Sequence, residues 1–290
     1  MTLDQLAAFV AVAKRQHLTQ AAAALHLSSS AVSSAIKALE TMHGVALFHR
    51  VGRGIELTSA GRRFLPDARD MLARAKGTER LLDELAGNDR GVIELQASQT
   101  IANYWLPPRL MRFHAQYPGI EVKLQLGNTT TVTEAVMSGA AELGFIEGTI
   151  DEPALASQRV ASDRLMIVMS ARSPLADTDD LLSLSWVMRE PGSGTRSAFE
   201  AALRAHHIDP AKLEVVMTLP SNEAVLSAVR TSTSATALSE AVVTPFLHNG
   251  DLRALPFALD LREFTLLRHK ERSLSAVAKA FETFCRAFTD

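Results

Sequence analysis

The sequence predicts an α/β protein that begins with a winged helix-turn-helix, continues through one long helix and ends in an α/β body. Two short helical segments separated by a polar turn occupy residues 18–40, and the second is rich in serine. Apolar residues then recur at spacings of four and three across residues 58–87. Beyond residue 91, short apolar strands alternate with helical segments, a pattern typical of a mostly parallel sheet covered by helices.

Composition predicts a folded chain that does not enter a membrane. The 290 residues, 47% of them hydrophobic, are enough for two or three packed domains. The apolar runs stay short of the roughly 18 residues that a membrane span needs, and residues 1–4 lack the pattern that opens a signal peptide. Cys285 is the only cysteine, which excludes an internal disulfide and a thiolate metal cluster. We therefore expect a cytoplasmic protein.

Charge is distributed unevenly along the chain. Residues 1–66 contain seven Lys or Arg and three Asp or Glu, an excess of four positive charges. Because the whole chain has a formal net charge of −2, the remaining residues carry −6. A basic N-terminal region on an acidic body predicts contact with phosphate groups at that end of the chain.

Helical signals begin at the N-terminus. Thr2 and Gln5 have the spacing of a capping box, and Leu6 and Val10 continue an apolar face, so a first helix is expected from residue 3. Residues 18–25 form the predicted second helix, in which four consecutive alanines allow another helix to approach closely. Both helices would support a third.

The third helix carries a polar outer face. Ser28 or Ser29 caps its start, and Gly44 ends it. Its inward apolar stripe consists of Val32, Ala35, Ile36 and Leu39. Its outward face consists of Ser30, Ser33, Ser34 and Lys37. A helix of this kind after a tight turn fits the major groove of DNA, whereas an isolated match would indicate only a solvated face.

A wing and a long helix follow. Residues 47–57 alternate around Gly52, Arg53 and Gly54, which predicts a β-hairpin with a basic tip. The seam of the long helix consists of Phe64, Ala68, Met71, Ala75, Thr78, Leu82 and Leu85. Such a seam needs a partner helix, which favours a symmetric dimer, although it could instead pack on the chain's own body. Residues 87–91 break the helix and mark a hinge.

The body is predicted as two lobes. Its expected strands are residues 92–97, 120–126, 143–146, 165–169, 186–188, 213–217 and 236–238, with a helix over 101–117. About 200 residues of this pattern favour two subdomains. The expected domains are 1–58, a linker and hinge at 59–90, and a body at 91–290, whose first lobe spans about 91–162 plus 268–290 and whose second spans about 163–267.

Polar clusters follow several strands of this body. The expected ligand-binding residues are Ser98, Gln99 and Thr100 after the first strand, Asn128, Thr129 and Thr130 after the second, and Glu147 after the third. Ligands of open α/β sheets gather at the carboxyl ends of strands. Across from them, Gly192, Ser193, Gly194, Thr195 and Arg196 open a helix with free backbone donors, hydroxyls and a cation. That combination suits an anion, although such a string is also typical of a plain helix cap.

Enzymatic and metal sites are not predicted. Ser193 lacks the glycine two residues before it that a Gly-x-Ser-x-Gly nucleophile elbow requires, and the sequence has no phosphate-binding loop or His-Glu-x-x-His motif. The adjacent His206 and His207 have no acidic or cysteine partner at metal-ligand spacing. We therefore expect no catalytic residue, no metal and no cofactor.

Taken together, these motifs resemble the LysR-type transcriptional regulators over essentially the whole chain. The motifs are Ala21-Ala22, the segment 25–28, Ala31-Val32-Ser33, and the segments 36–40, 47–50 and 57–61. The resemblance implies a winged helix-turn-helix, a dimerising linker helix and a two-lobed, periplasmic-binding-protein-like α/β effector domain. The segment 189–196 with Gly127 and Asn128 is similar to the subgroup that controls carbon fixation or sulfur assimilation, whose effectors are phosphorylated metabolites or small oxyanions.

The resemblance also implies the DNA contacts. By position they are Thr19, Gln20, Ser28, Ser29, Ser30, Ser33, Ser34, Lys37, Arg50 and Arg53. Because the family usually has Gln-Pro where this chain has Ser29-Ser30, base preference does not carry over. The implied partners are double-stranded promoter DNA, a small-molecule effector, RNA polymerase and further copies of the chain in a homodimer or homotetramer. The rival classes are an enzyme, against which the missing catalytic motifs count, and a periplasmic binding protein, against which the missing signal-peptide pattern and the attached DNA-binding motif count.

Overall fold

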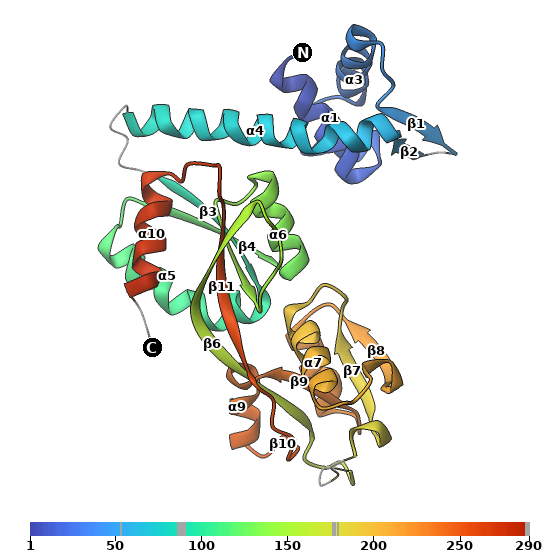
Figure 1. The fold of residues 1–290 in the computed structure, drawn as a ribbon, viewed down its shortest axis with the longest axis vertical. Helices are drawn as coiled ribbons and strands as arrows, with labels where there is room; N and C mark the ends of the chain where they lie inside the picture. Colours follow the sequence, from blue (N-terminus) through green and yellow to red (C-terminus); the bar gives the residue numbers. More distant parts are fainter. Residues whose placement is uncertain (53, 86–90, 176–177, 179, 288–290) are drawn as a thin grey trace. The chain divides into compact units, whose positions relative to one another are not determined.

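The computed structural model describes residues 1–52, 54–85, 91–175, 178 and 180–287. The chain divides into two compact units, Met1–Ala86 and Gly87–Asp290 (Figure 1). Within the described residues, none of the helices is both long enough and apolar enough to cross a membrane.

The first unit begins with the three predicted helices, α1 (Leu3–Arg15), α2 (Leu18–Ala24) and α3 (Ser29–His43). Their ends follow the expected local signals. Thr2 and Gln5 form a capping box at the start of α1. The Ser28 hydroxyl accepts a hydrogen bond from the Ala31 N–H at 3.2 Å, and Gly44 ends α3 with a left-handed φ of 64°. Ser28, rather than Ser29, is therefore the cap.

The core of this unit lies between the three helices and the start of α4. The rings of Phe48 and Phe64 lie 5.4 and 5.2 Å from the ring of Phe9. On α3, Val32, Ile36 and Leu39 are buried and Ala35 is half-buried, which confirms the inward stripe. The predicted outward side chains, Ser30, Ser33, Ser34 and Lys37, are all exposed.

A wing and a long helix complete the first unit. Strands β1 (Phe48–Val51) and β2 (Gly54–Leu57) pair antiparallel, and Arg53 at their tip lies outside the described residues. Helix α4 (Ser59–Leu85) continues through Pro66. Of its predicted seam, Phe64 and Ala68 pack into the core of this unit. Met71 and Leu82 are 43% and 61% exposed, so this part of the seam lies on the surface of the single chain.

The second unit contains one continuous sheet. Its strands are β3 (Val92–Ser98), β4 (Glu121–Gly127), β5 (Leu143–Glu147), β6 (Leu155–Ser170), β7 (Ser185–Arg189), β8 (Glu214–Leu219), β9 (Ala235–Ser239), β10 (Leu252–Ala254) and β11 (Leu261–His269). Their order is β4-β3-β5-β11-β6-β9-β7-β8, with β10 beside β6. Strand β3 is parallel to β4 and β5, and β7 is parallel to β8 and β9.

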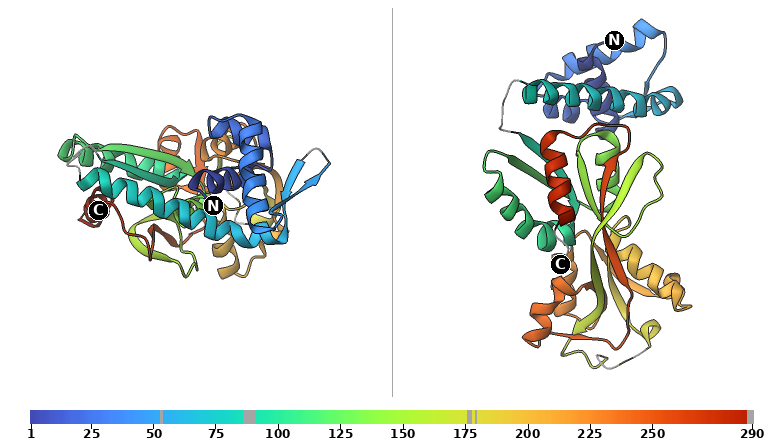
Figure 2. Two further views of the ribbon diagram at one scale, coloured as in Figure 1. Left: turned by 90° about the horizontal axis from the view of Figure 1, so that it is seen from above. Right: turned by 60° about the vertical axis from the view of Figure 1, so that its left-hand side comes forward.

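Two long strands in the middle depart from the predicted, mostly parallel sheet. Strands β6 and β11 pair antiparallel with each other, β11 also pairs antiparallel with β5, and β6 with β9 and β10 (Figures 1 and 2). The expectation was wrong here because β11 was not predicted and β6 begins ten residues before the predicted 165. The early part of β6 has alternating exposure rather than a continuous apolar run, so it lacks the signal of a buried strand.

Helices cover the sheet in two lobes with separate cores. They are α5 (Leu106–Gln116), α6 (Thr129–Ser138), α7 (Gly194–Ala205), α8 (Asn222–Arg230), α9 (Glu240–His248) and α10 (Ala276–Ala287), with a π-helical turn at Ile101–Trp105 and 3-10 turns at Leu181–Ser183 and Pro210–Lys212. The first core surrounds Phe113, Phe145 and Phe281, and the second surrounds Trp186 and Phe199. Strand β6 packs against the first core through Val160 and Ala161 and contributes residues from Leu165 onward to the second, so it passes from one lobe to the other. Strand β11, paired with β6, contributes Phe264 and Leu266 to the first core.

Candidate functional site

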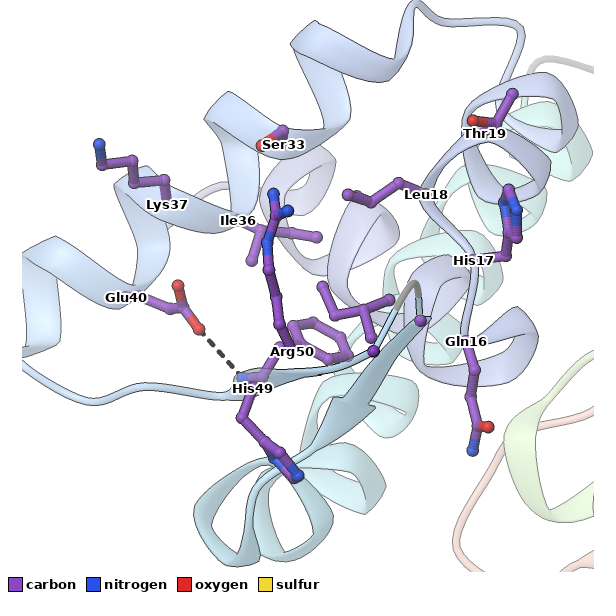
Figure 3. A pocket seen from close by; sticks show the side chains of 14 residues that line it. Gln16, His17, Leu18, Thr19, Ser33, Ile36, Lys37, Glu40, His49 and Arg50 are labelled. Carbon is purple, nitrogen blue, oxygen red and sulfur yellow. Dashed lines mark hydrogen bonds between the residues drawn. The ribbon is translucent and has the colours of Figure 1, made fainter.

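Four of the predicted DNA-contacting side chains line one hollow of the first unit. Thr19 on α2, Ser33 and Lys37 on α3, and Arg50 on β1 surround it (Figure 3). All four are exposed. The hollow therefore presents two hydroxyls and two cations, which can bond base edges and phosphates.

The other predicted contacts lie outside this hollow. Gln20, Ser28, Ser29, Ser30 and Ser34 are exposed but do not line it, and Arg53 is not among the described residues. The Ser28 hydroxyl caps α3 and lies 2.9 Å from the Ser30 hydroxyl, so part of its hydrogen-bonding capacity is used within the chain.

Glu40 and Thr58 tie the wing to the helices, a role that motif reasoning missed. The Glu40 carboxylate accepts hydrogen bonds from the N–H groups of Leu47 at 2.7 Å and Phe48 at 3.0 Å, the latter shown dashed in Figure 3. The Thr58 hydroxyl donates to the Ala46 carbonyl at 2.8 Å and accepts from the Gly61 N–H at 3.0 Å. These contacts hold β1 and the start of α4 in place beside α3.

A second candidate site forms where α6 and α7 begin. Asn128 caps α6, and its side-chain amide donates to the Glu190 carboxylate at 3.1 Å. The Thr130 N–H donates to the Gly192 carbonyl at 3.4 Å. The structure thereby brings the predicted cluster 128–130 of the first lobe against the predicted segment 192–195 of the second.

The start of α7 has free hydrogen-bond donors. Ser193 is the N-cap residue and makes no side-chain capping bond. Among the described residues, none accepts a hydrogen bond from the N–H groups of Gly194, Thr195 or Arg196. The Thr129 hydroxyl is buried, has no hydrogen-bond partner in the described part of the chain, and would lie 2.6 Å from a Cβ atom added at Gly194. Free N–H groups at a helix start favour an anion.

Arginines near this site are already paired with acidic groups. Arg196 donates to Glu200 at 2.7 Å and to the Arg189 carbonyl at 3.1 Å. Its guanidinium group is therefore paired with a carboxylate of its own helix. Arg189 pairs with Glu190 at 2.8 Å. Burial alone would raise the pKa of Glu190, but the hydrogen bonds from Arg189 and Asn128 and the charge of Arg189 outweigh it, and the pKa is lowered.

Arg262 and Asn222 connect the lobes, and sequence reasoning missed both. Arg262 donates to Asp163 at 2.8 Å, to Thr195 at 3.0 Å and to Thr100 at 3.3 Å. Asn222 donates to Thr100 at 3.2 Å and accepts from Arg189. The predicted Thr100 therefore anchors this network.

The two neighbours of Thr100 in the predicted cluster have different surroundings. The Gln99 side chain donates to the Pro220 carbonyl at 3.1 Å and accepts from the Asn222 N–H at 2.8 Å, so it joins the lobes. The Ser98 hydroxyl is buried, with no partner among the described residues.

Two family models match the chain. The model described as "Bacterial regulatory helix-turn-helix protein, lysR family" matches residues 3–62, and "LysR substrate binding domain" matches residues 86–290. The HTH-type transcriptional regulator YeiE of Escherichia coli K12, itself uncharacterized, is 35% identical over 98% of this chain and 97% of YeiE. A probable RuBisCO transcriptional regulator of Nostoc is 29% identical over 97% of this chain and 86% of the relative.

Solved structures share the fold. Full-length CbnR complexed with its target DNA aligns with a TM-score of 0.67 at 21% identity, over 99% of both chains. The regulatory domain of Synechocystis CcmR in complex with 2-PG aligns with a TM-score of 0.61 at 24% identity, over 68% of this chain and 96% of that domain. At these identities the alignments establish the fold alone.

Proposed function

The chain belongs to the LysR family of bacterial helix-turn-helix regulators, and on that premise we propose that a small anion bound between its two lobes controls its hold on promoter DNA. Family membership makes it a DNA-binding transcriptional regulator with an effector-binding domain, and its relatives are regulators rather than enzymes. The match to a RuBisCO regulator agrees with the carbon-fixation resemblance.

The proposed DNA surface comprises the exposed face of α3, the side chains around the hollow and the wing. CbnR, which shares the fold, has been solved with its target DNA. Ser30, Ser33, Ser34 and Lys37 are all exposed on one face of α3. Serine hydroxyls bond several base edges or phosphates, and Lys37 and Arg50 supply charge.

Arg53→Ala is expected to weaken binding to all DNA sequences alike, because a cation at the wing tip would neutralise phosphate without reading bases. The slope of log K against log salt is negative, and each lost phosphate contact reduces its magnitude by about 0.9. Titrations of one duplex at several salt concentrations measure that slope. Lys123→Ala is the control, because Lys123 is an exposed cation of the second unit. An unchanged slope for Arg53→Ala would show that Arg53 does not contact the DNA backbone.

The observation that carries the effector proposal is the start of α7. Three N–H groups there lack acceptors among the described residues, and the buried Thr129 hydroxyl faces them without a partner. The proposed binding set keeps the predicted residues of both lobes, including Ser98 and Arg196, and adds Arg262 as a link between them. A structural neighbour, CcmR, has been solved with the ligand 2-PG.

Thermal-shift titration of the full chain tests this proposal. Sulfur oxyanions, phosphorylated sugars and dicarboxylates are the probes, and at least one is expected to raise the melting temperature, since a ligand that binds only the folded state stabilises it. The proposal fails if none of these anions has an effect while a cation or an apolar compound does.

We further propose that the chain acts in the cytoplasm as a homodimer or homotetramer on an interrupted palindrome. The exposed Met71 and Leu82 of α4 support pairing through this helix. Helix-turn-helix dimers span half-sites about one helical turn apart. Effector binding would change the arrangement of the two lobes, hence the spacing or bending of DNA and the contact with RNA polymerase. A footprint on the chain's own upstream region with and without ligand tests this arrangement.

A further inference from the structure

Glu147 is a buried carboxylate beside the proposed anion site. It ends β5, and it is only 4% exposed. Its Oε2 atom would lie 2.8 Å from a Cβ atom added at Gly194, so it lies against the first turn of α7. Among the described residues, none donates a hydrogen bond to this carboxylate. The Glu147 carboxylate therefore lies beside the proposed anion site, and its oxygens can accept hydrogen bonds from a bound ligand.

The other acidic side chains around the site differ in this respect. Glu190 accepts from Arg189 and Asn128, Glu200 accepts from Arg196, and Asp163 accepts from Arg262 and Ser239. Each arginine is thus already paired with one of these carboxylates. Glu147 is the exception among them, and it leaves the site with an unbalanced negative charge.

This charge restricts which anions the site accepts. A fully deprotonated anion at the start of α7 would meet a like charge and would leave the Glu147 carboxylate without a donor. A buried polar group without a hydrogen-bond partner is costly, and a site built to bond a hydroxyl rejects the analogue that lacks it. An anion that carries its own O–H or N–H satisfies both groups, because its charge faces the N–H groups of α7 and its donor faces Glu147.

We propose that Glu147 is the specificity-determining residue of the effector site and selects a small anion that carries its own hydrogen-bond donor. Inorganic phosphate, which keeps an O–H at pH 7, hydroxy acids and amino acids belong to this class, whereas sulfate and simple carboxylates do not. The inference rests on the proposed function, since it requires that an anion binds at the start of α7.

Two matched ligand pairs test the selection on the full-length protein by calorimetric titration at pH 7. Inorganic phosphate is compared with sulfate, which has a similar shape but no proton. Glycolate is compared with acetate, which lacks the hydroxyl. We expect the donor-bearing member of each pair to bind at least tenfold more tightly, and equal affinities within both pairs overturn the proposal.

Glu147→Gln tests the residue itself. The amide removes the negative charge and can donate, so the preference for phosphate over sulfate is expected to fall at least tenfold, with sulfate gaining affinity. Glu142→Gln is the matched control, because Glu142 is a buried glutamate of the same lobe whose carboxylate oxygens accept from the N–H and hydroxyl of Ser275. An unchanged preference for phosphate over sulfate in folded Glu147→Gln overturns the proposal. If this variant fails to fold, the affinities of the wild-type protein for the two ligand pairs test the proposal instead.

Gly194→Ala distinguishes a failure of the proposed anion site from a failure of the proposed role of Glu147. Its Cβ atom would lie 2.6 Å from the Thr129 hydroxyl and 2.8 Å from Glu147, so it fills the site and is expected to abolish binding of phosphate. Sulfate and phosphate that bind equally to the wild type but not to Gly194→Ala would retain the proposed function and overturn the role of Glu147. If no anion binds the wild type in either pair, both the site and the selection are overturned.

Discussion

Arg262→Ala is expected to lower the free energy of unfolding of the second unit by about 3–5 kcal/mol, because it leaves Asp163 as a buried charge without its partner. The side chains of Arg262 and Asp163 are only 4% and 8% exposed. The same substitution removes one hydrogen bond to Thr100 and one to Thr195, which belong to different lobes. Loss of these bonds is expected to weaken the link between the lobes as well as the fold.

Tryptophan fluorescence during denaturant unfolding of the full chain measures this loss. Trp105 and Trp186 are the only tryptophans, and both are buried in the second unit, so the signal excludes the DNA-binding unit. Arg268→Ala is the matched control on the same strand, because Arg268 is 36% exposed and lies 3.5 Å from Glu282. Such pairs contribute about 1 kcal/mol or less. Equal losses of unfolding free energy in the two variants would show that the buried Arg262–Asp163 pair contributes no more stability than the more exposed Arg268–Glu282 pair.

Sequence reasoning succeeded where the signal is local. Thr2, Ser28 and Gly44 mark helix ends through bonds to residues within a few positions, and the structure places helix ends at all three. The wing and the parallel strands of each lobe also follow from short patterns. Arg196 could have been interpreted better, since Glu200 lies four residues later on the same predicted helix, the spacing at which helical ion pairs form.

The remaining features depend on distant residues. Arg262 and Asp163 are 99 positions apart, and each is a lone charge in a strand with no motif around it. Strand β11 is held by partners on both sides, β5 and β6, and both pairings are set by the fold rather than by nearby residues. Glu147 was predicted as a site residue from its place after a strand, but only the three-dimensional structure shows that α7 packs against it. The lack of a donor to its carboxylate within the described part of the chain is likewise invisible in the sequence.

Gly61→Ala is expected to destabilise the DNA-binding unit by about 1–3 kcal/mol and to reduce DNA binding, because the added methyl group has no space. A Cβ atom at Gly61 would lie 2.1 Å from the Leu47 carbonyl oxygen and 2.8 Å from the Leu57 side chain. The first of these atoms belongs to the backbone that precedes β1, so relief requires the wing or α4 to move. Because the wing and α3 together form the proposed DNA surface, that movement is expected to disturb it.

Gly77→Ala in the same helix is the matched control, since apart from its chain neighbours and the backbone of its own helix no atom lies within 4 Å of its added Cβ atom. Alanine is favoured over glycine in a helix interior by about 1 kcal/mol, so this variant is expected to be neutral or more stable. Thermal melting followed by circular dichroism gives the stabilities, and titration with duplex DNA gives the affinities. Tryptophan fluorescence should stay unchanged in both variants, because both tryptophans lie in the other unit. If Gly61→Ala has the same melting temperature and the same DNA affinity as Gly77→Ala, the close approach of α4 to the wing does not require glycine at position 61.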